Sequence, residues 1–209
     1  MSESVKDFYN QLHGERRGEA AHRMVMPVVR QVADLLPQSA TVLDVGAGQG
    51  ANALYLAERG FTVEAVDVSD EAVAQMSEEA IERGIQKFST RVTDGKTDLI
   101  REKYDLIIST YMFHHVTPEV AVELLDAMKE NTNAQGFNIL SVWLNKGIVF
   151  DRSEAKGLSR FFPGPGALQK LYTGWDIRMY KESERSTGVQ LEDGTPGRNW
   201  RTILLAQKP

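Results

Sequence analysis

The residues with the clearest chemical meaning form a glycine-rich segment, Asp44–Gly50, and an acid further along the chain, Asp67. The segment overlaps an apolar run at 41–45, and Asp67 ends a second apolar run at 62–66. A doubly wound sheet binds an adenosine-containing cofactor with a buried strand, a glycine-rich turn into a helix and a second strand that ends in an acid. The spacing therefore predicts a cofactor site in which Asp67 accepts hydrogen bonds from the two ribose hydroxyls.

The three glycines of this segment have separate expected roles. Gly46 lets the chain turn sharply off the strand, whereas Gly48 and Gly50 leave room where the backbone approaches a ligand or where the helix lies close to a strand. The run from Gly46 to Ala51 also fits the dinucleotide pattern G-x-G-x-x-A, so a nicotinamide-dependent oxidoreductase is an open alternative on spacing alone.

Asp44 helps to distinguish a dinucleotide from an adenosine-containing cofactor without phosphate. It is a carboxylate on an otherwise apolar strand, two residues before the first glycine. A buried acid is costly unless a cation or a hydrogen-bond donor meets it, and a pyrophosphate would be repelled there. S-adenosylmethionine has no phosphate and carries an ammonium that Asp44 can help to hold. The chain at this point resembles the class I S-adenosylmethionine-dependent methyltransferases, whose first motif has the form D-x-G-x-G-x-G.

This resemblance implies S-adenosyl-L-methionine as the cofactor and a cleft at the carboxyl ends of the strands. An acid after the third strand, here Asp94, would accept a hydrogen bond from the adenine amine, and the end of the fourth strand would lie beneath the methionine moiety. The cofactor-binding residues that it implies are Asp44, Gly46, Ala47, Gly48, Gly50, Asn52, Asp67, Val68, Thr93, Asp94, Thr110 and Tyr111.

Two groups of residues are candidates for catalysis. His115, next to His114, follows the fourth strand and could take a proton from an attacking group, although a structural role for one of the pair is the competing interpretation. No metal site is expected, since neighbouring histidines in an extended segment point to opposite faces. Arg185, with Arg160 as a possible partner, is nominated to position an anionic substrate; Arg152 and Arg178 are further candidates of the same kind.

Composition and charge favour a compact enzyme of one domain. The chain has 209 residues, a net charge of −5 and no cysteine, so thiolate chemistry is excluded and general attraction to nucleic acid or an anionic membrane is not expected. Met1–Asn10 lacks the apolar core of a secretion signal, and no apolar run reaches the length of about 18 residues that a spanning helix needs. We expect a cytoplasmic enzyme that acts on a small molecule; its oligomeric state is not indicated.

Strand and helix patterns alternate along the chain and then end in two strands, which predicts an α/β, Rossmann-like, doubly wound sheet of seven strands, mostly parallel, with a C-terminal antiparallel hairpin. The chain is expected to form a single domain, 1–209, with an N-terminal helical segment at 1–37 and a substrate lid or loop at about 145–174. The expected strands are 41–45, 62–66, 88–92, 104–110, 137–144, 175–186 and 199–207, and the expected helices are 23–36, 52–59, 71–83, 118–131 and 167–172.

Within the methyltransferases, the chain is similar to the bacterial tellurite-resistance family. The likeness is carried by the order of the elements, by residues 52–57 after the glycines and by Leu171–Trp175 before the hairpin. It implies methylation of a tellurium or selenium oxyanion. The chain departs from the family at Ala51, at 134–136, and at 187–190, where the family has a His-Arg pair and Arg185 is the nearest base here.

Three functions are therefore compared. The favoured one is methyl transfer from S-adenosylmethionine to a small molecule, for which a tellurium or selenium oxyanion is one candidate. The alternatives are a nicotinamide-dependent oxidoreductase, which Asp44 disfavours, and a non-catalytic module that binds S-adenosylmethionine.

Overall fold

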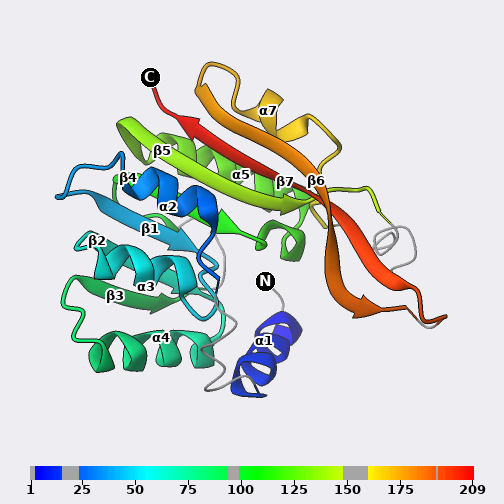
Figure 1. Ribbon diagram of the computed structural model, residues 1–209, viewed down its shortest axis with the longest axis horizontal. Coiled ribbons are helices and arrows are strands. Elements are labelled where there is room, and N and C mark those ends of the chain that lie inside the picture. The colour runs from blue at the N-terminus through cyan, green and yellow to red at the C-terminus, as the bar shows by residue number, and fades with distance from the viewer. Residues whose placement is uncertain (1–2, 16–23, 94–98, 148–159, 192) are drawn as a thin grey trace.

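Seven strands and the helices between them account for most of the chain in the computed structural model, which describes residues 3–15, 24–93, 99–147, 160–191 and 193–209 (Figure 1). The strands are β1 Thr41–Val45, β2 Thr62–Asp67, β3 Phe88–Val92, β4 Tyr104–Thr110, β5 Thr132–Trp143, β6 Asp176–Gln190 and β7 Pro196–Gln207. The helices are α1 Glu3–Glu15, α2 Pro27–Ala33, α3 Ala51–Glu58, α4 Asp70–Glu82, the 3₁₀ turn η3 Phe113–His115, α5 Pro118–Glu130 and α7 Ala167–Leu171.

The strands form one sheet in the order β3-β2-β1-β4-β5-β7-β6. Strands β1 to β5 pair in parallel, and β7 is antiparallel to both of its neighbours. The expected sheet, mostly parallel with a C-terminal antiparallel hairpin, is confirmed. Because the chain reverses its direction of winding between β1 and β4, their carboxyl ends open a crevice, which is where open α/β sheets bind ligands.

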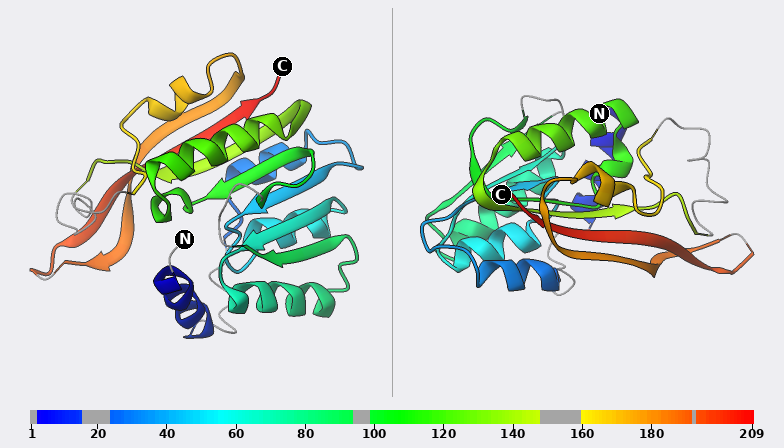
Figure 2. Two further views of the ribbon diagram at one scale, coloured as in Figure 1. Left: turned by 180° about the vertical axis from the view of Figure 1, so that it is seen from behind. Right: turned by 90° about the horizontal axis from the view of Figure 1, so that it is seen from above.

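Helices cover the two faces of the sheet, as the views in Figure 2 show. Two apolar cores are formed by the sheet and these helices. On one face α2, α3 and α4 contribute Val29, Leu56 and Met76 to the core. On the other face α5 and α7 contribute Leu124 and Leu168. Strands buried on both faces need apolar side chains at nearly every position, which explains why β1 and β4 are mainly apolar.

The starts of α4 and α5 follow from their capping residues, as the sequence predicted. The Ser69 hydroxyl accepts a hydrogen bond from the Ala72 N–H at 3.1 Å, which satisfies one of the free donors of α4. Thr117 caps α5 in the same way, and Pro118 occupies its first turn. Both helices therefore begin within a residue of their expected positions.

Five elements differ from the expectation. The hairpin strands are longer than expected, since β6 ends at Gln190, not at 186, and β7 begins at Pro196, not at 199. Helix α2 begins at Pro27, not at 23, and has 7 residues. Strand β5 begins at Thr132, not at 137, because Thr132 pairs with Tyr104 of β4 before a register shift, next to a hydrogen bond from the Tyr104 N–H to the Asn131 carbonyl at 2.9 Å. Helix α1 had been expected only as part of a helical segment at 1–37, and Figure 1 shows it off the carboxyl ends of the strands.

The expected lid at 145–174 falls partly outside the described residues, since 148–159 are not among them. The described flanks are tied to the body of the protein: the Asn145 N–H donates to the Pro163 carbonyl at 3.1 Å, and the Phe161 N–H donates to the Val116 carbonyl at 2.9 Å. Within the described part of the chain, no helix combines the length and the apolar character needed to span a bilayer.

Candidate functional site

The turn from β1 into α3 brings the glycines to the crevice with φ angles of 71° at Gly46, 57° at Gly48 and 79° at Gly50. Glycine adopts such positive angles without steric cost, whereas other residues are strained there. The Gly46 and Ala47 N–H groups both donate to the Val66 carbonyl, at 2.8 and 3.0 Å, so the turn is anchored to β2. The sequence motif therefore becomes a rigid loop.

The three glycines solve different packing problems, as the sequence suggested. A Cβ added at Gly46 would lie 2.7 Å from the Met112 side chain, and one at Gly50 would lie 2.7 Å from the Met76 side chain. Neither position has room for a larger residue. A Cβ at Gly48 would meet only a His13 ring carbon at 3.8 Å, so Gly48 opens onto free space at the site.

Asp67, at the end of β2, is held in place by the glycine loop. One carboxylate oxygen accepts the Gly48 N–H at 2.8 Å and the other accepts the Ser69 N–H at 3.0 Å. A carboxylate has about four lone-pair positions, so each oxygen can accept a further hydrogen bond. Asp67 therefore presents a fixed, negatively charged acceptor to the crevice.

Asp44 lies in the same region but deeper, with 1% of its surface exposed. Burial, and secondarily the charge of Asp67, raise the pKa of Asp44 from 3.8 to about 7, although a hydrogen bond from the Ala53 N–H acts in the opposite direction. Its Oδ1 atom is buried without a hydrogen-bond partner. A buried acceptor of this kind is suited to a cationic or hydrogen-bonding ligand group, reached directly or through water.

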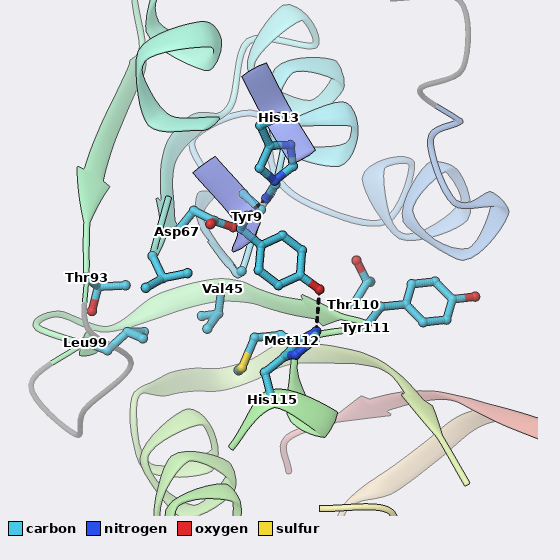
Figure 3. Close-up of a pocket in the computed structure, with 14 residues that line it drawn as sticks. Tyr9, His13, Val45, Asp67, Thr93, Leu99, Thr110, Tyr111, Met112 and His115 are labelled. Carbon is cyan, nitrogen blue, oxygen red and sulfur yellow. Dashed lines mark hydrogen bonds between the residues drawn. The ribbon is translucent and has the colours of Figure 1, made fainter. Parts of the chain in front are cut away.

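A cavity of about 250 Å³ lies between the glycine loop, the end of β4 and α1 (Figure 3). It brings together residues that are far apart in the sequence. Those that line it are Tyr9, His13, Val45, Gly46, Ala47, Gly48, Asp67, Val68, Thr93, Leu99, Thr110, Tyr111, Met112 and His115.

Most of the expected cofactor-binding residues are in this lining, and three described ones are not. Asp44 and Gly50 lie behind the loop, as described above. The Asn52 side-chain oxygen accepts the Met26 N–H at 3.0 Å, so this residue joins α3 to the segment before α2. Asp94 lies outside the described residues, and its role at the adenine remains a prediction.

The end of β4 has an unusual backbone. Tyr111 has a φ of 59°, a value that is uncommon for a bulky residue and costs on the order of 1–3 kcal/mol. Its N–H donates to the Ser141 carbonyl at 2.8 Å, which helps to hold this conformation. The strained residue forms part of the pocket wall, and its ring points away from the other lining side chains (Figure 3).

His115 reaches the pocket from η3 and meets Tyr9 of α1, whose hydroxyl lies 2.6 Å from the His115 Nε2 atom (Figure 3). Burial and the nearby Arg160 guanidinium lower the pKa of His115 from 6.5 to about 4. Burial, His115 and Arg160 lower the pKa of His114 to about 3. Both imidazoles are therefore neutral near pH 7, and His115 is a weak base there.

Helix α1 closes one side of the pocket, which the sequence alone did not indicate. Its Asn10 side-chain oxygen accepts the Ser69 hydroxyl at 2.7 Å, and its His13 carbonyl accepts the Gln75 side-chain amide at 2.9 Å. Lys6 forms an ion pair with Asp70 at 2.6 Å. The aromatic spacing of Tyr9 and His13, one helical turn apart, is the only trace of this role in the sequence.

The arginines nominated for the substrate have different positions. Arg185 is exposed on β6, opposite Asn199 of β7, and is not in the pocket lining. Arg160 is half-buried near the two histidines, and Arg178 is on the exposed surface, paired with Asp176 at 3.0 Å. Arg152 lies outside the described residues. Sequence reasoning did not single out Arg201, which contacts the Tyr111 hydroxyl.

The sheet order, the glycine loop after β1 and the acid that ends β2 define the fold of the class I S-adenosylmethionine-dependent methyltransferases. A family model described as "Tellurite resistance protein TehB" matches residues 6–191. The chain belongs to this family.

Among its relatives is the "Probable S-adenosyl-L-methionine-dependent methyltransferase TehB" of Haemophilus influenzae, which is 28% identical over 167 residues, covering 80% of this chain and 57% of the relative. The chain thus spans little more than half the length of this relative. The crystal structure of TehB from Haemophilus influenzae superposes with a TM-score of 0.78 at 24% identity, covering 98% of this chain and 67% of that one. The magnesium protoporphyrin IX methyltransferase of Synechocystis PCC 6803, solved with bound SAH, has a TM-score of 0.72 at 18% identity and covers 98% of both chains. These structural likenesses concern the fold.

Proposed function

We propose that the chain transfers a methyl group from S-adenosylmethionine to a small-molecule acceptor. The observation that carries this proposal is the pocket at the carboxyl ends of β1 and β4, where the Asp67 carboxylate is fixed by the Gly48 N–H of the glycine loop. Family membership and the name of the Haemophilus influenzae relative support the same activity. The buried acids favour a cofactor without phosphate, which speaks against a dinucleotide.

Different residues contact the ribose, the adenine and the amino acid tail of the cofactor. Asp67 accepts the ribose hydroxyls, and Val68, Thr93 and Leu99 surround the adenine at the β2 and β3 end of the pocket. The amino acid tail lies along the glycine loop. Asp44 acts on its ammonium from behind this loop, directly or through water.

The reaction needs little proton chemistry from the protein. A lone pair of the acceptor forms a bond to the methyl carbon while the carbon–sulfur bond breaks, and its electron pair stays on sulfur to give S-adenosylhomocysteine. Any proton that the acceptor loses goes to solvent. The protein accelerates such a displacement by holding the two reactants in line and by excluding water.

His115 acts in this proposal as a positioning residue. A base with a pKa of about 4 removes protons poorly near pH 7, because catalysis is most effective when the two values match. Its hydrogen bond to Tyr9 instead holds α1 against the end of β4. The acceptor would then react in a pocket from which α1 excludes water.

Calorimetry with S-adenosylmethionine, S-adenosylhomocysteine and NAD tests the class of cofactor. We expect S-adenosylmethionine and S-adenosylhomocysteine to bind and NAD not to bind. The reverse result would favour an NAD-dependent oxidoreductase over a methyltransferase. A turnover assay that follows S-adenosylhomocysteine then separates an enzyme from a binding module. Tellurite and selenite belong in this assay, since the name of the family indicates an oxyanion acceptor.

A further inference from the structure

A half-buried arginine, Arg201, lies beside the cofactor pocket without an acidic partner among the residues that the structure describes. Its Nη1 atom contacts the Tyr111 hydroxyl, and its Cζ atom is 5.7 Å from the centre of the Tyr111 ring. Its Nε atom is buried and makes no hydrogen bond. Since a cation that is partly removed from water and lacks an anion costs free energy, this arrangement indicates a missing negative partner.

The acids closest to Arg201 along β6 are engaged elsewhere. Glu182 and Glu184 pair in the sheet with the two β7 neighbours of Arg201, so they point to the opposite face of the hairpin. One Glu182 oxygen accepts the Gly166 N–H at 2.7 Å, and Glu184 forms an ion pair with Arg198 at 2.9 Å. Neither acid neutralises Arg201.

One aromatic ring, that of Tyr111, contacts the guanidinium, and a second ring packs against the first. Trp143 of β5 lies directly opposite Arg201 in the sheet, and its ring centre is 5.1 Å from that of Tyr111. The Tyr111 backbone is strained, and its ring points away from the other lining side chains (Figure 3). The ring lies near Trp143 and Arg201, while the residue remains part of the pocket lining. All three side chains are half-buried, and Tyr111 joins them to the cofactor pocket, because its residue lines the pocket while its ring contacts the other two.

We propose that Arg201, Tyr111 and Trp143 form the acceptor subsite and that it binds a flat organic acid with one negative charge. This inference rests on the proposed methyl transfer and names its substrate class. The guanidinium would bind a carboxylate or phenolate through two N–H donors, and the aromatic side chains would contact the flat apolar part. An inorganic oxyanion has no apolar surface to place against the two rings.

The test uses the full chain saturated with S-adenosylhomocysteine and measures binding of 4-hydroxybenzoate by calorimetry. Its uncharged analogue 4-hydroxybenzamide, as well as selenite and tellurite, is titrated in parallel. We expect 4-hydroxybenzoate to bind at least tenfold more tightly than the amide and the two oxyanions. Arg201→Met should weaken binding of 4-hydroxybenzoate at least tenfold, and Trp143→Leu should weaken this binding severalfold. S-adenosylhomocysteine affinity should stay within twofold in both variants.

Arg198→Met is the matched control, because Arg198 is an exposed arginine of the same strand that already has an acidic partner. It should leave binding of 4-hydroxybenzoate unchanged. Arg201→Lys keeps the charge and is the second variant if Arg201→Met fails to fold; it should retain part of the binding. Thermal unfolding adds a separate readout, since removing an unpaired, half-buried charge should not lower the melting temperature.

The outcomes test the subsite, the class of its ligand and the proposed methyl transfer separately. Equal binding of 4-hydroxybenzoate to wild type and Arg201→Met, or no binding to either, would overturn the subsite. Binding of selenite or tellurite that depends on Arg201 but not on Trp143 would overturn the organic acid in favour of an oxyanion. Failure of the wild-type protein to bind S-adenosylhomocysteine would instead overturn the proposed methyl transfer.

Discussion

Replacing Asp44 by asparagine should change how stability depends on pH. The folded protein raises the pKa of Asp44 from 3.8 to about 7. Between about pH 4 and pH 7 the unfolded chain has therefore lost a proton that the folded chain keeps, so the wild-type protein loses stability as pH rises through this window. The loss is complete above about pH 7.

The size of this effect follows from the shift. A shift of about 3 pH units corresponds to an upper limit on the order of 4 kcal/mol, at about 1.4 kcal/mol per unit. The Asp44→Asn variant has nearly the same shape, keeps an oxygen for the Ala53 N–H and carries no charge at any pH. The lowered pKa values of His114 and His115 act in the opposite direction, raising stability with pH up to about 6.5, but they are common to both proteins and cancel in the comparison.

Urea unfolding at pH 5 and at pH 8 measures the difference. We expect Asp44→Asn to gain up to about 2.7 kcal/mol relative to wild type between these two values, because about two pH units of the window lie between them. S-adenosylhomocysteine affinity should rise with pH in the wild type, because the ligand ammonium favours the charged carboxylate, and should be flat in the variant. A stability difference that does not change with pH would refute the assignment of a raised pKa to Asp44.

Three further changes test the rest of the site. Asp67→Ala should weaken binding of S-adenosylhomocysteine by about 1.5–3 kcal/mol, the range for hydrogen bonds to a charged group, as calorimetry would show; an affinity within twofold of wild type would mean that the ribose lies elsewhere. Gly48→Val should abolish cofactor binding, since the new side chain enters the pocket and a β-branched residue is strained at the positive φ of Gly48; a variant with an unchanged circular dichroism spectrum that still binds contradicts the loop assignment. Tyr9→Phe removes the hydrogen bond to His115 and should raise proteolysis of α1 by trypsin severalfold while β-sheet content stays constant; equal cleavage rates would show that this bond does not hold the helix.

Much of the fold could be predicted because it depends on local rules. The mainly apolar sequences of β1 and β4 indicate strands that are buried on both faces, and Ser69 and Thr117 mark helix starts by their capping chemistry. The less accurate boundaries have a tertiary cause. Strand β5 begins early because Thr132 pairs with Tyr104 of β4 across a register shift, a contact that no propensity encodes.

The candidate site likewise contains residues that local rules predict and residues that only long-range contacts bring together. The glycine loop and the position of Asp67 could be predicted from the sequence, because both belong to one strand–turn–helix–strand unit whose geometry follows from spacing and from the need for glycine at positive φ. The contribution of Tyr9 from α1 and the contact between Arg201 and Tyr111 depend on the tertiary structure. These three residues are about ninety or more positions apart in the sequence. An isolated arginine or tyrosine gives the same sequence signal on a solvated surface as in a pocket. Their proximity results from the order of the strands and the packing of α1 on α4, which are properties of the whole fold.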